Sequence, residues 1–457
     1  MMLFTTDWLT SLFTDFRGAA KSSIEINEIT TDSRKKTNQS LFIPLVGENF
    51  NGHDFMKDAL EQGAAAALWH KKKDLPGFLP ADFPVFFVED TLSALQELAS
   101  AYREKVNPTV IAVTGSNGKT TTKDIIASVV GSSFKTHHTK GNLNNHIGVP
   151  LTILSMSSDT QALVVEMGMN HFGEIEALTK IAQPDYAVIT NIGESHIEYL
   201  GSREGIAKAK LEITKGMTKN GYLIIDGDEI LLKQVHQCDH VLTCGFDDQN
   251  DLAIKEVNIS HESTKFKLSD NEVYTIPLLG SHHALNAAFA VTIAGLLGIE
   301  KNKVKQALTQ LKLTSMRFEL INGINGSAVI NDAYNASPTS MKASINAVRH
   351  LEGFRQKVLV LGDVFELGKN SKSLHQSVAD SIDESVAAVF TLGRDAREIS
   401  SAVKRSHPTI DCRHFTAKET LMAALAEYTL EGTLILFKAS RGMQFESLVN
   451  QVVDPTY

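Results

Sequence analysis

A glycine-rich loop between a buried strand and a helix constrains the fold of this chain most. Residues 110–113 read Val-Ile-Ala-Val, residues 114–121 read Thr-Gly-Ser-Asn-Gly-Lys-Thr-Thr, and apolar residues recur at helical spacing over 125–130. Glycines let a backbone approach phosphates, and a helix N-terminus presents unpaired N–H groups to them. We expect Lys119 to reach the β- and γ-phosphates and the Thr120 hydroxyl to bind Mg²⁺. The loop therefore predicts a nucleoside triphosphate site. The expected contacts are Gly115, Ser116, Asn117, Gly118, Lys119, Thr120 and Thr121.

The match to the general phosphate-binding loop is imperfect. Counted back from Gly118 and Lys119, the first glycine of the general pattern falls on Val113. A Gly-Lys turn that binds no ligand is therefore the alternative interpretation. Kinases, GTPases and many ATPases share loops of this kind, so the loop alone does not indicate the reaction.

The chain is too long for one hydrophobic core. Its 457 residues exceed the roughly 100–200 residues of a usual domain, and we expect three domains, at residues 1–88, 89–313 and 314–457. The second and third alternate buried apolar runs with helices, which predicts sheets of parallel strands. The fold class is therefore α/β: a small α/β N-terminal domain, a central parallel-sheet domain with the phosphate loop, and a Rossmann-like C-terminal domain.

The expected strands follow the apolar runs. They are residues 110–113, 163–165, 187–189 and 223–225 in the central domain and residues 329–330, 358–362, 389–393 and 434–437 in the third. Polar and apolar residues alternate over 252–278, which predicts an antiparallel hairpin around Asp270 and Asn271. Residues 284–299 carry no charge and predict a buried helix that is too short to span a membrane.

Composition argues against several classes of protein. A net charge of −9 disfavours a general nucleic-acid binder, which would carry a basic face. The three cysteines are few and odd in number, so we expect no disulfide framework and a reducing, cytoplasmic compartment. The first 16 residues include Asp7 and Asp15 and no basic leader, which predicts a short amphipathic helix rather than a signal peptide. We expect a monomer without a membrane span.

One cluster of metal-binding residue types has two interpretations. His236, Cys238, His240 and Cys244 could bind zinc, but their spacing fits no standard zinc finger. The segment also runs into an expected strand at residues 241–242. We interpret it as a loop followed by a core cysteine.

Spaced motifs along the whole chain give it a family resemblance. Besides the loop, they are residues 141–150, 166–170, 173–175, 190–193, 195–196, Lys210, 331–338, 361–363, 366–368, His375 and 438–442. With these motifs the chain resembles the Mur ligase family, which also resembles folylpolyglutamate synthases. The resemblance covers all three expected domains in order. Within the family, the chain resembles the branch that adds D-alanyl-D-alanine to UDP-N-acetylmuramoyl-tripeptide in peptidoglycan precursor synthesis.

This resemblance implies an ATP-dependent amide-bond ligase. Such enzymes transfer the γ-phosphoryl group of ATP to the C-terminal carboxylate of the UDP-linked tripeptide, and the amine of D-alanyl-D-alanine then attacks the acyl phosphate. Mg²⁺ and lysines stabilise the developing charge. The implied catalytic residues are Lys119, Glu166, His196 and Lys210, and the implied metal ligands are Thr120, Glu166, His196 and a carbamylated Lys210. A surface carboxylate, a structural histidine and a solvated helix lysine are the ordinary alternatives for the last three.

The resemblance also implies binding residues for the nucleotide and the substrates. Those for ATP are Asn286, Arg317, Asp332, Tyr334 and Asn335; those for the UDP-linked substrate are Ser33, Arg34, Gly47, Asn145 and His146; those of the third domain are Lys438, Ser440 and Arg441. Residues 334–338 could also be only a turn. His283 and Ala439 stand where Asn and Gly are usual. A neutral imidazole has one donor and one acceptor on a differently shaped ring, so we do not expect His283 to contact adenine.

Two rival functions differ from this interpretation. Another ligase of the family, which adds a single amino acid or adds glutamate to folate, would lack the segments at 334–338 and 362–368 together. A nucleotide-dependent binding protein without catalysis is the second rival. It is disfavoured by the presence of Lys119, Glu166, His196 and Lys210. We expect that the third domain must swing toward the second before its Arg317 and Asp332 can complete an ATP site.

Overall fold

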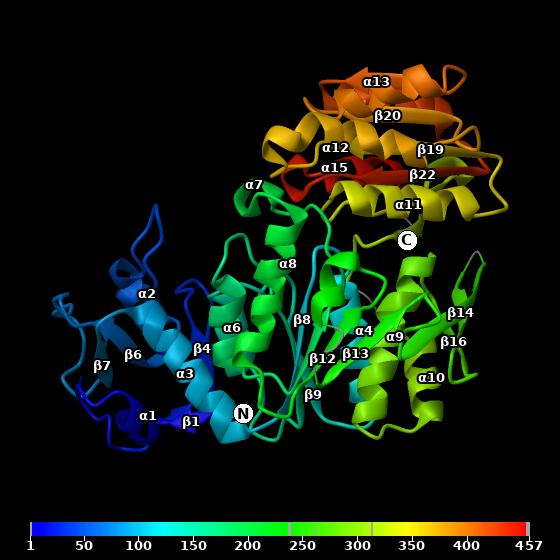
Figure 1. Cartoon of the computed structure of the whole chain (residues 1–457). Helices are drawn as coiled ribbons and strands as arrows, with labels where there is room; N and C mark the ends of the chain where they lie inside the picture. The colour runs from blue at the N-terminus through cyan, green and yellow to red at the C-terminus, as the bar shows by residue number, and fades with distance from the viewer. Residues whose placement is uncertain (1, 236–238, 261, 312–313, 454–457) are drawn as a thin grey trace.

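Three β-sheets follow one another along the chain (Figure 1). The computed structural model describes residues 2–235, 239–260, 262–311 and 314–453. Within these residues the sheets have five, nine and six strands, beside one two-stranded pair. We call the parts built around them the first lobe (β1 to β7), the second lobe (α3 to α10) and the third lobe (β17 to α15). The predicted α/β fold class is confirmed.

The first lobe has a mixed five-stranded sheet in the order β2-β7-β6-β5-β4, antiparallel only between β2 and β7. Its strands are β2 (Phe16–Arg17), β4 (Glu28–Thr30), β5 (Ser40–Phe42), β6 (Ala64–His70) and β7 (Val85–Val88), beside the pair β1 (Phe4–Thr5) and β3 (Glu25–Ile26); its helices are α1 (Thr6–Leu12), η1 (Gly52–Phe55) and α2 (Met56–Glu61). The N-terminal helix is shorter than predicted. Phe16 pairs with Phe86 in the sheet instead of extending the helix.

The second lobe is a nine-stranded sheet in the order β16-β15-β14-β13-β12-β11-β8-β10-β9. Its strands are β8 (Thr109–Thr114), β9 (Thr136–His138), β10 (Ala162–Glu166), β11 (Tyr186–Ile189), β12 (Tyr222–Asp226), β13 (Val241–Gly245), β14 (Leu252–Ile259), β15 (Thr264–Leu268) and β16 (Val273–Ile276). The helices are α3 (Thr91–Val106), α4 (Lys119–Gly131), α5 (Gly148–Leu154), α6 (Glu174–Ala182), α7 (Ile197–Leu200), α8 (Arg203–Leu211), η2 (Glu212–Gly216), η3 (Ile230–Val235), α9 (Ser281–Leu296) and α10 (Lys301–Thr309).

Helices cover both faces of this sheet, which explains its continuous apolar strands. Along β8, Val110 and Ala112 pack in one buried cluster with α3, α5 and α6, whereas Ile111 and Val113 pack in another with α4 and α9. The predicted antiparallel hairpin is confirmed in β15 and β16, and β14 joins it to the parallel strands. The predicted buried helix is confirmed as α9. No helix among the described residues is both long and apolar enough to cross a bilayer.

The third lobe is a six-stranded sheet in the order β17-β18-β22-β19-β20-β21, parallel except at β17. Its strands are β17 (Glu319–Asn322), β18 (Ala328–Asn331), β19 (Gln356–Gly362), β20 (Ala388–Leu392), β21 (Asp411–Phe415) and β22 (Thr433–Lys438). The helices are η4 (Ile324–Gly326), α11 (Pro338–His350), η5 (Gly368–Asn370), α12 (Ser371–Val378), η6 (Ala379–Ser381), α13 (Arg397–Ser406), α14 (Lys418–Leu425), η7 (Ala426–Tyr428), η8 (Arg441–Met443) and α15 (Glu446–Val452).

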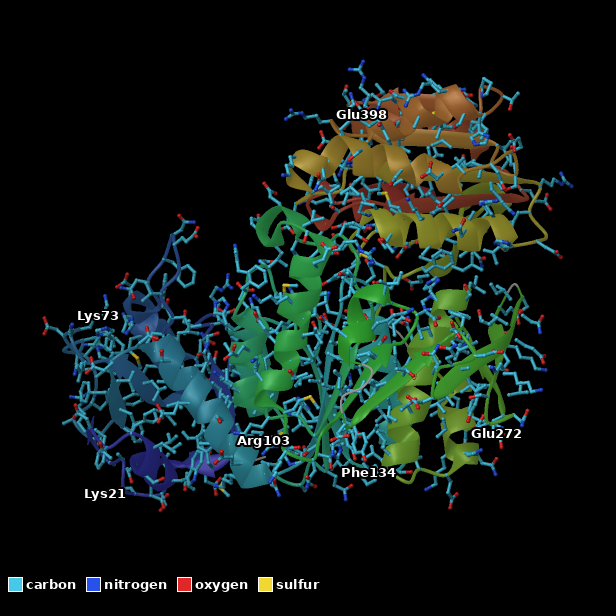
Figure 2. The ribbon with its side chains drawn as sticks, in the orientation of Figure 1. Lys21, Lys73, Arg103, Phe134, Glu272 and Glu398 are labelled. Carbon is cyan, nitrogen blue, oxygen red and sulfur yellow. The ribbon has the colours of Figure 1, made fainter. Side chains whose placement is uncertain are left out.

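Helix α3 fixes the first lobe to the second. It follows β7 directly, yet it packs against α5 and α6 of the second lobe. Arg103 donates hydrogen bonds to the backbone carbonyls of Ala182 and Gln183 at 3.0 and 2.9 Å, and Figure 2 places Arg103 beside the second lobe. The Tyr102 hydroxyl donates to the carbonyl of Met156 at 3.0 Å.

Asp124 on α4 anchors the segment that enters the third lobe. Its Oδ2 accepts hydrogen bonds from the backbone N–H (3.1 Å) and the hydroxyl (2.9 Å) of Thr314. The same carboxylate pairs with the buried Lys123. The start of the third lobe is therefore tied to the helix that begins at the glycine-rich loop.

Candidate active site

One cavity lies at the carboxyl ends of the parallel strands of the second lobe. Its volume is ≈ 550 Å³, and both the second and the third lobes line it. Ligands usually bind at this edge of an open α/β sheet. The predicted residues that line it are Ser116, Asn117, Gly118, Lys119, Thr120, Thr121, Asn145, His146, Glu166, His196, Asn286, Arg317, Asp332, Tyr334, Asn335, Lys438 and Arg441. The predicted residues outside its lining are Ser33, Arg34, Gly47, Gly115, Lys210 and Ser440.

The glycine-rich loop has the conformation that a phosphate cradle needs. A Cβ atom at Gly115 would lie 1.8 Å from Thr190 Oγ1, and Gly118 has φ +76°, so both positions require glycine. Lys119 begins α4, and its Nζ donates a hydrogen bond to the carbonyl of Gly115 at 2.7 Å. Burial lowers the pKa of Lys119, while the nearby Glu166 carboxylate opposes this shift. The ammonium group is therefore held inside the loop, close to a carboxylate.

Glu166 is a buried carboxylate at the end of β10, with 2% of its surface exposed. Its Oε2 accepts the Thr120 hydroxyl at 2.7 Å, and its Oε1 accepts the Asn144 amide at 2.8 Å. Its backbone N–H donates to the Thr139 hydroxyl at 3.0 Å. Asn144 lies within the motif at 141–150 but was not among the predicted site residues. These oxygen groups are of the kind that Mg²⁺ prefers.

His196 and Lys210, two further predicted site residues, lie in different settings. His196 has a left-handed backbone (φ 63°), and its Nδ1 lies 2.5 Å from Oε2 of Glu366 in the third lobe. This contact lowers the pKa of Glu366. Lys210 is 2% exposed on α8. Burial, followed by the charge of Lys119, lowers the pKa of Lys210 well below its usual range. Lys210 is therefore an amine that readily loses its charge.

The third lobe presents a cation-rich wall to the cavity. The guanidinium of Arg317 lies 4.1 Å from the centre of the Tyr334 ring, and that of Arg441 lies 5.7 Å from it. Asp332 accepts Lys438 Nζ at 2.6 Å and the Ser344 hydroxyl at 2.6 Å. Cations on this wall suit a polyanionic ligand.

Two hydrogen bonds join the third lobe to the second beside the glycine-rich loop. Neither bond was predicted from the sequence. The Ser337 hydroxyl at the start of α11 donates to Asn117 Oδ1 at 2.8 Å. The Thr339 hydroxyl donates to Glu194 Oε2 at 2.6 Å. Residues 334–338 are therefore more than a turn, since they dock the third lobe onto the loop.

The first turn of α9 lies next to the loop. Asn286 Oδ1 would be 3.1 Å from a Cβ atom at Gly118. His283 Nδ1 lies 3.4 Å from Asn286 Nδ2, and both residues line the cavity.

Asp226, at the end of β12, also lines the cavity, and burial raises the pKa of Asp226 to about 7. Like Glu166, Asp226 is an acidic residue at the end of a buried apolar strand. This sequence pattern could have identified it.

Four of the residues predicted to bind the substrates lie outside the cavity lining, in the first and third lobes. Ser33 is buried in the first lobe. The Arg34 side chain is 86% exposed and pairs with Asp32 at 2.8 Å, which lowers the pKa of Asp32 to about 2. Gly47 lies in the first lobe with Phe50 against it. Ser440 is buried in the third lobe, where its hydroxyl accepts the backbone N–H of Phe365 at 2.9 Å.

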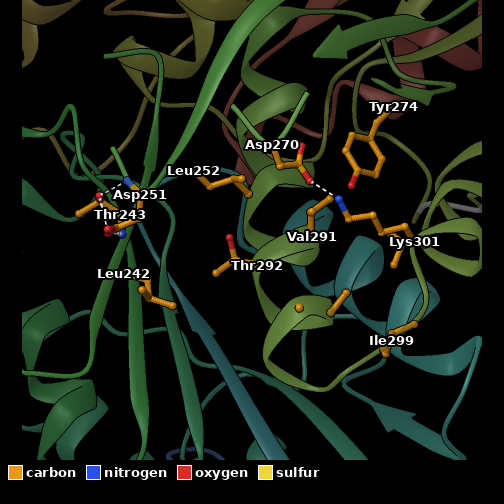
Figure 3. Close-up of a pocket in the computed structure, with 13 residues that line it drawn as sticks. Leu242, Thr243, Asp251, Leu252, Asp270, Tyr274, Val291, Thr292, Ile299 and Lys301 are labelled. Atoms are coloured by element: carbon orange, nitrogen blue, oxygen red, sulfur yellow. Dashed lines mark hydrogen bonds and ion pairs between the residues drawn. The ribbon is translucent and has the colours of Figure 1, made fainter. Parts of the chain in front are cut away.

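A second cavity of ≈ 290 Å³ lies between α9 and strands β13, β14 and β16 (Figure 3). Its walls are mostly apolar, and Asp270 pairs with Lys301 beside it at 3.0 Å. Thr243 donates to Asp251 there at 2.9 Å. It contains none of the predicted site residues.

The zinc interpretation of the cluster at 236–244 falls partly outside the described residues, since positions 236–238 are not among them. Cys244 is buried, with its Sγ 3.1 Å from the Thr292 hydroxyl. Burial raises the pKa of Cys244 to about 12. Across the described ranges, no group of three or more His, Cys, Asp or Glu residues is placed to hold a metal ion.

Three family models match successive parts of the chain: Mur ligase family, catalytic domain (residues 25–103), Mur ligase middle domain (113–294) and Mur ligase, glutamate ligase domain (316–441). A UDP-N-acetylmuramoyl-tripeptide–D-alanyl-D-alanine ligase of Bacillus subtilis is 46% identical over 431 residues, which cover 94% of this chain and 93% of that protein.

Solved structures of MurF ligases are also similar to this chain. A crystal structure of MurF from Acinetobacter baumannii superposes with a TM-score of 0.86 at 29% identity, covering 98% of each chain. A structure of the MurF ligase of Thermotoga maritima in complex with ADP gives a TM-score of 0.81 at 29% identity, covering 93% of this chain and 96% of that one.

Proposed function

The chain belongs to the Mur ligase family, and we infer that it joins D-alanyl-D-alanine to UDP-N-acetylmuramoyl-tripeptide while converting ATP to ADP. It is an ATP-dependent ligase of peptidoglycan precursor synthesis that acts through an acyl phosphate. The observation that carries this conclusion is the 46% identity with the Bacillus subtilis ligase along 94% of the chain. It also excludes the rival interpretation as a ligase that adds glutamate to folate.

The glycine-rich loop and its lysine hold the triphosphate in this proposal. The backbone N–H groups at the start of α4 face the phosphates, and Lys119 exchanges its bond to Gly115 for phosphate oxygens. Arg317 and Arg441 add positive charge from the third lobe. Their charges stabilise the transferring phosphoryl group as negative charge develops on it.

Mg²⁺ fits the oxygen groups beside the loop. The Thr120 hydroxyl and the Glu166 carboxylate are already in contact, and a carboxylate as buried as Glu166 is stabilised by a cation. Mg²⁺ is usually held by one or two carboxylates together with substrate phosphates. When bound, it neutralises charge on the triphosphate. His196, which lines the same cavity, is the third proposed ligand.

We also propose that Lys210 carries a carbamate. Only a neutral amine reacts with CO₂, and the lowered pKa of Lys210 supplies one. No hydrogen bond to its Nζ occurs among the residues described. A carbamate would replace the repulsion between Lys210 and Lys119 by attraction.

We propose binding roles for the other predicted site residues. Asp332 and Asn335 bind the nucleoside beside Tyr334. The proposed contacts of the UDP-linked substrate are Ser33, Arg34, Gly47, Asn145 and His146, and those of the third lobe are Lys438, Ser440 and Arg441. We place the domain borders at 88/89 and 313/314, which agrees with the attachment of α3 to the second lobe. We propose a monomer that works in the cytoplasm, where ATP is available.

ADP release tests the function directly. Purified protein is mixed with ATP, Mg²⁺ and UDP-N-acetylmuramoyl-tripeptide, with and without D-alanyl-D-alanine, and ADP is measured by a coupled assay. We expect ADP release that depends on both the tripeptide and the dipeptide. Release that ignores the dipeptide would contradict the named activity. L-alanyl-L-alanine serves as the matched control substrate.

A further inference from the structure

Lys123 is a buried cation that the proposed chemistry does not use. It lies on α4, one turn after Lys119, and is 1% exposed. Its Nζ pairs with the neighbouring Asp124 carboxylate and donates a hydrogen bond to the backbone carbonyl of Thr139 at 2.9 Å. Because a buried charge is costly without such partners, these contacts hold α4 and the segment after β9 together.

Thr139 connects Lys123 to Glu166. Strand β9 ends at His138, and the hydroxyl of the next residue, Thr139, accepts the backbone N–H of Glu166 at 3.0 Å. Thr139 is 0% exposed, so water does not compete for its hydrogen bonds. The direction of the Glu166 carboxylate depends on where the backbone of Glu166 lies. Thr139 is therefore held by Lys123 through its carbonyl and holds Glu166 through its hydroxyl.

Asp124 connects the same lysine to the third lobe. Its Oδ1 contacts Lys123, and its Oδ2 accepts the backbone N–H and the hydroxyl of Thr314, where the chain enters that lobe. The Asp124 side chain is 8% exposed, and hydrogen bonds are stronger in such a low-dielectric environment than in water. A continuous series of contacts therefore runs from Thr314 to Glu166.

We propose that Lys123 and Asp124 are positioning residues that couple the attachment of the third lobe to the divalent-cation site at Glu166. Neither residue lines the cavity, so both act on the cation through Thr139. With Thr314 bound, Asp124 keeps its orientation toward Lys123. Glu166 then keeps the orientation that suits a cation. Coupling between two sites is reciprocal, so a cation at Glu166 also strengthens the attachment at Thr314. The inference rests on the proposed Mg²⁺ site.

Direct measurement of metal binding tests the part of the series next to the cation. Mn²⁺, which suits the same oxygen ligands as Mg²⁺, is titrated into the full chain saturated with ADP, and free Mn²⁺ is measured by electron paramagnetic resonance. Thr139→Val removes the acceptor for Glu166 at nearly constant size and should weaken Mn²⁺ binding about tenfold. ADP binding measured in EDTA should stay unchanged. Thr139→Ser keeps the hydroxyl and should restore the Mn²⁺ affinity.

Variants at the other end of the series test the coupling itself. Thr314→Val removes one of the two bonds to Asp124 and should weaken Mn²⁺ binding about threefold, whereas the control Thr314→Ser should not. Combined with Thr139→Val, it should cause no further loss, because the connection to Glu166 is already broken. Lys123→Met should likewise abolish the effect of Thr314→Val. Thermal unfolding shows whether each variant folds, and the threonine variants decide the test if Lys123→Met does not.

The outcomes separate this inference from the proposed function. If folded Thr314→Val binds Mn²⁺ as tightly as the unmodified chain, the coupling is refuted. If Thr139→Val weakens ADP binding in EDTA as much as Mn²⁺ binding, the loss is a general loss of structure and the positioning role is refuted. If the unmodified chain with ADP binds no Mn²⁺, the proposed cation site fails together with this inference. ADP release that depends on both substrates decides the proposed function separately.

Discussion

The nucleotide cavity and the first-lobe face around Arg34 are built in different ways. In the cavity, groups that are almost fully buried already hold one another, as Glu166 holds the Thr120 hydroxyl and Asp332 holds Lys438. On the first-lobe face, the Arg34 side chain is 86% exposed and forms an ion pair with Asp32, two residues away. The cavity is preorganised, whereas a ligand on the exposed face would have to order the side chains that it contacts.

The difference predicts where substitutions act. A residue removed from the cavity leaves a buried partner without its hydrogen bond, and the loss appears in the chemical step. A residue removed from the exposed face loses only a screened, solvated contact, and the loss appears in substrate affinity. Three variants test this contrast.

Lys119→Ala should have the largest effect. The variant removes the cation that meets the transferring phosphoryl group, so we expect a loss in kcat/KM of at least about 10³-fold. ADP release measures it, and unfolding temperature checks the fold. Lys219→Ala, which removes an exposed lysine of the second lobe, is the matched control and should keep full activity. Unchanged turnover in Lys119→Ala would refute the role of the loop.

Lys210→Ala should have the second-largest effect. Loss of the proposed carbamate should lower kcat by about 10²-fold, in the range found when a metal-site partner is lost. Formate or acetate added at high concentration should restore part of the activity by supplying a carboxylate. Lys208→Ala is the control, since Lys208 lies on another face of α8 with its Nζ 5.9 Å from the Phe172 ring centre. A Lys210→Ala variant with normal activity would eliminate the carbamate.

Arg34→Ala should have the smallest effect. We expect KM for the UDP-linked tripeptide to rise about fivefold with kcat unchanged, because an exposed cation adds only a modest, screened attraction to a diphosphate. The ratio of the KM of the variant to the KM of the unmodified chain should shrink as the ionic strength rises. Lys36→Ala, which removes an exposed charge two residues away, is the control. A fall in kcat for Arg34→Ala would mean that the two regions are not built differently.

Local sequence patterns predicted the lobes and the loop well, for physical reasons. Buried parallel strands such as β8 and β19 are continuous apolar runs, and a glycine-rich turn before a helix is itself a local signal. The edge strand β21 was missed because only one of its five residues is buried and its sequence, Asp-Cys-Arg-His-Phe, is largely polar.

Contacts between distant parts of the chain could not be predicted from such patterns. Ser337 and Asn117 are 220 positions apart, and Thr339 and Glu194 are 145 apart. No periodicity connects them, since they meet only because the third lobe docks on the second. The family resemblance implied residues of the loop and of the third lobe that line one cavity in the structure, but it did not indicate which of them bond to each other.

The hydrogen bonds from Thr314 to Asp124 hold the chain at the point where it enters the third lobe. In a rotation that breaks the other contacts between the lobes, such as Ser337–Asn117 and Thr339–Glu194, but keeps these bonds, residues close to Thr314 would travel little and remote residues would travel far. Arg317 is three positions from Thr314 and would stay near α4 during such a rotation. Helix α13, at the far edge of the lobe in Figure 1, would travel furthest. The cavity would then open on the side remote from Thr314, while Arg317 would remain close to Lys119 of the glycine-rich loop.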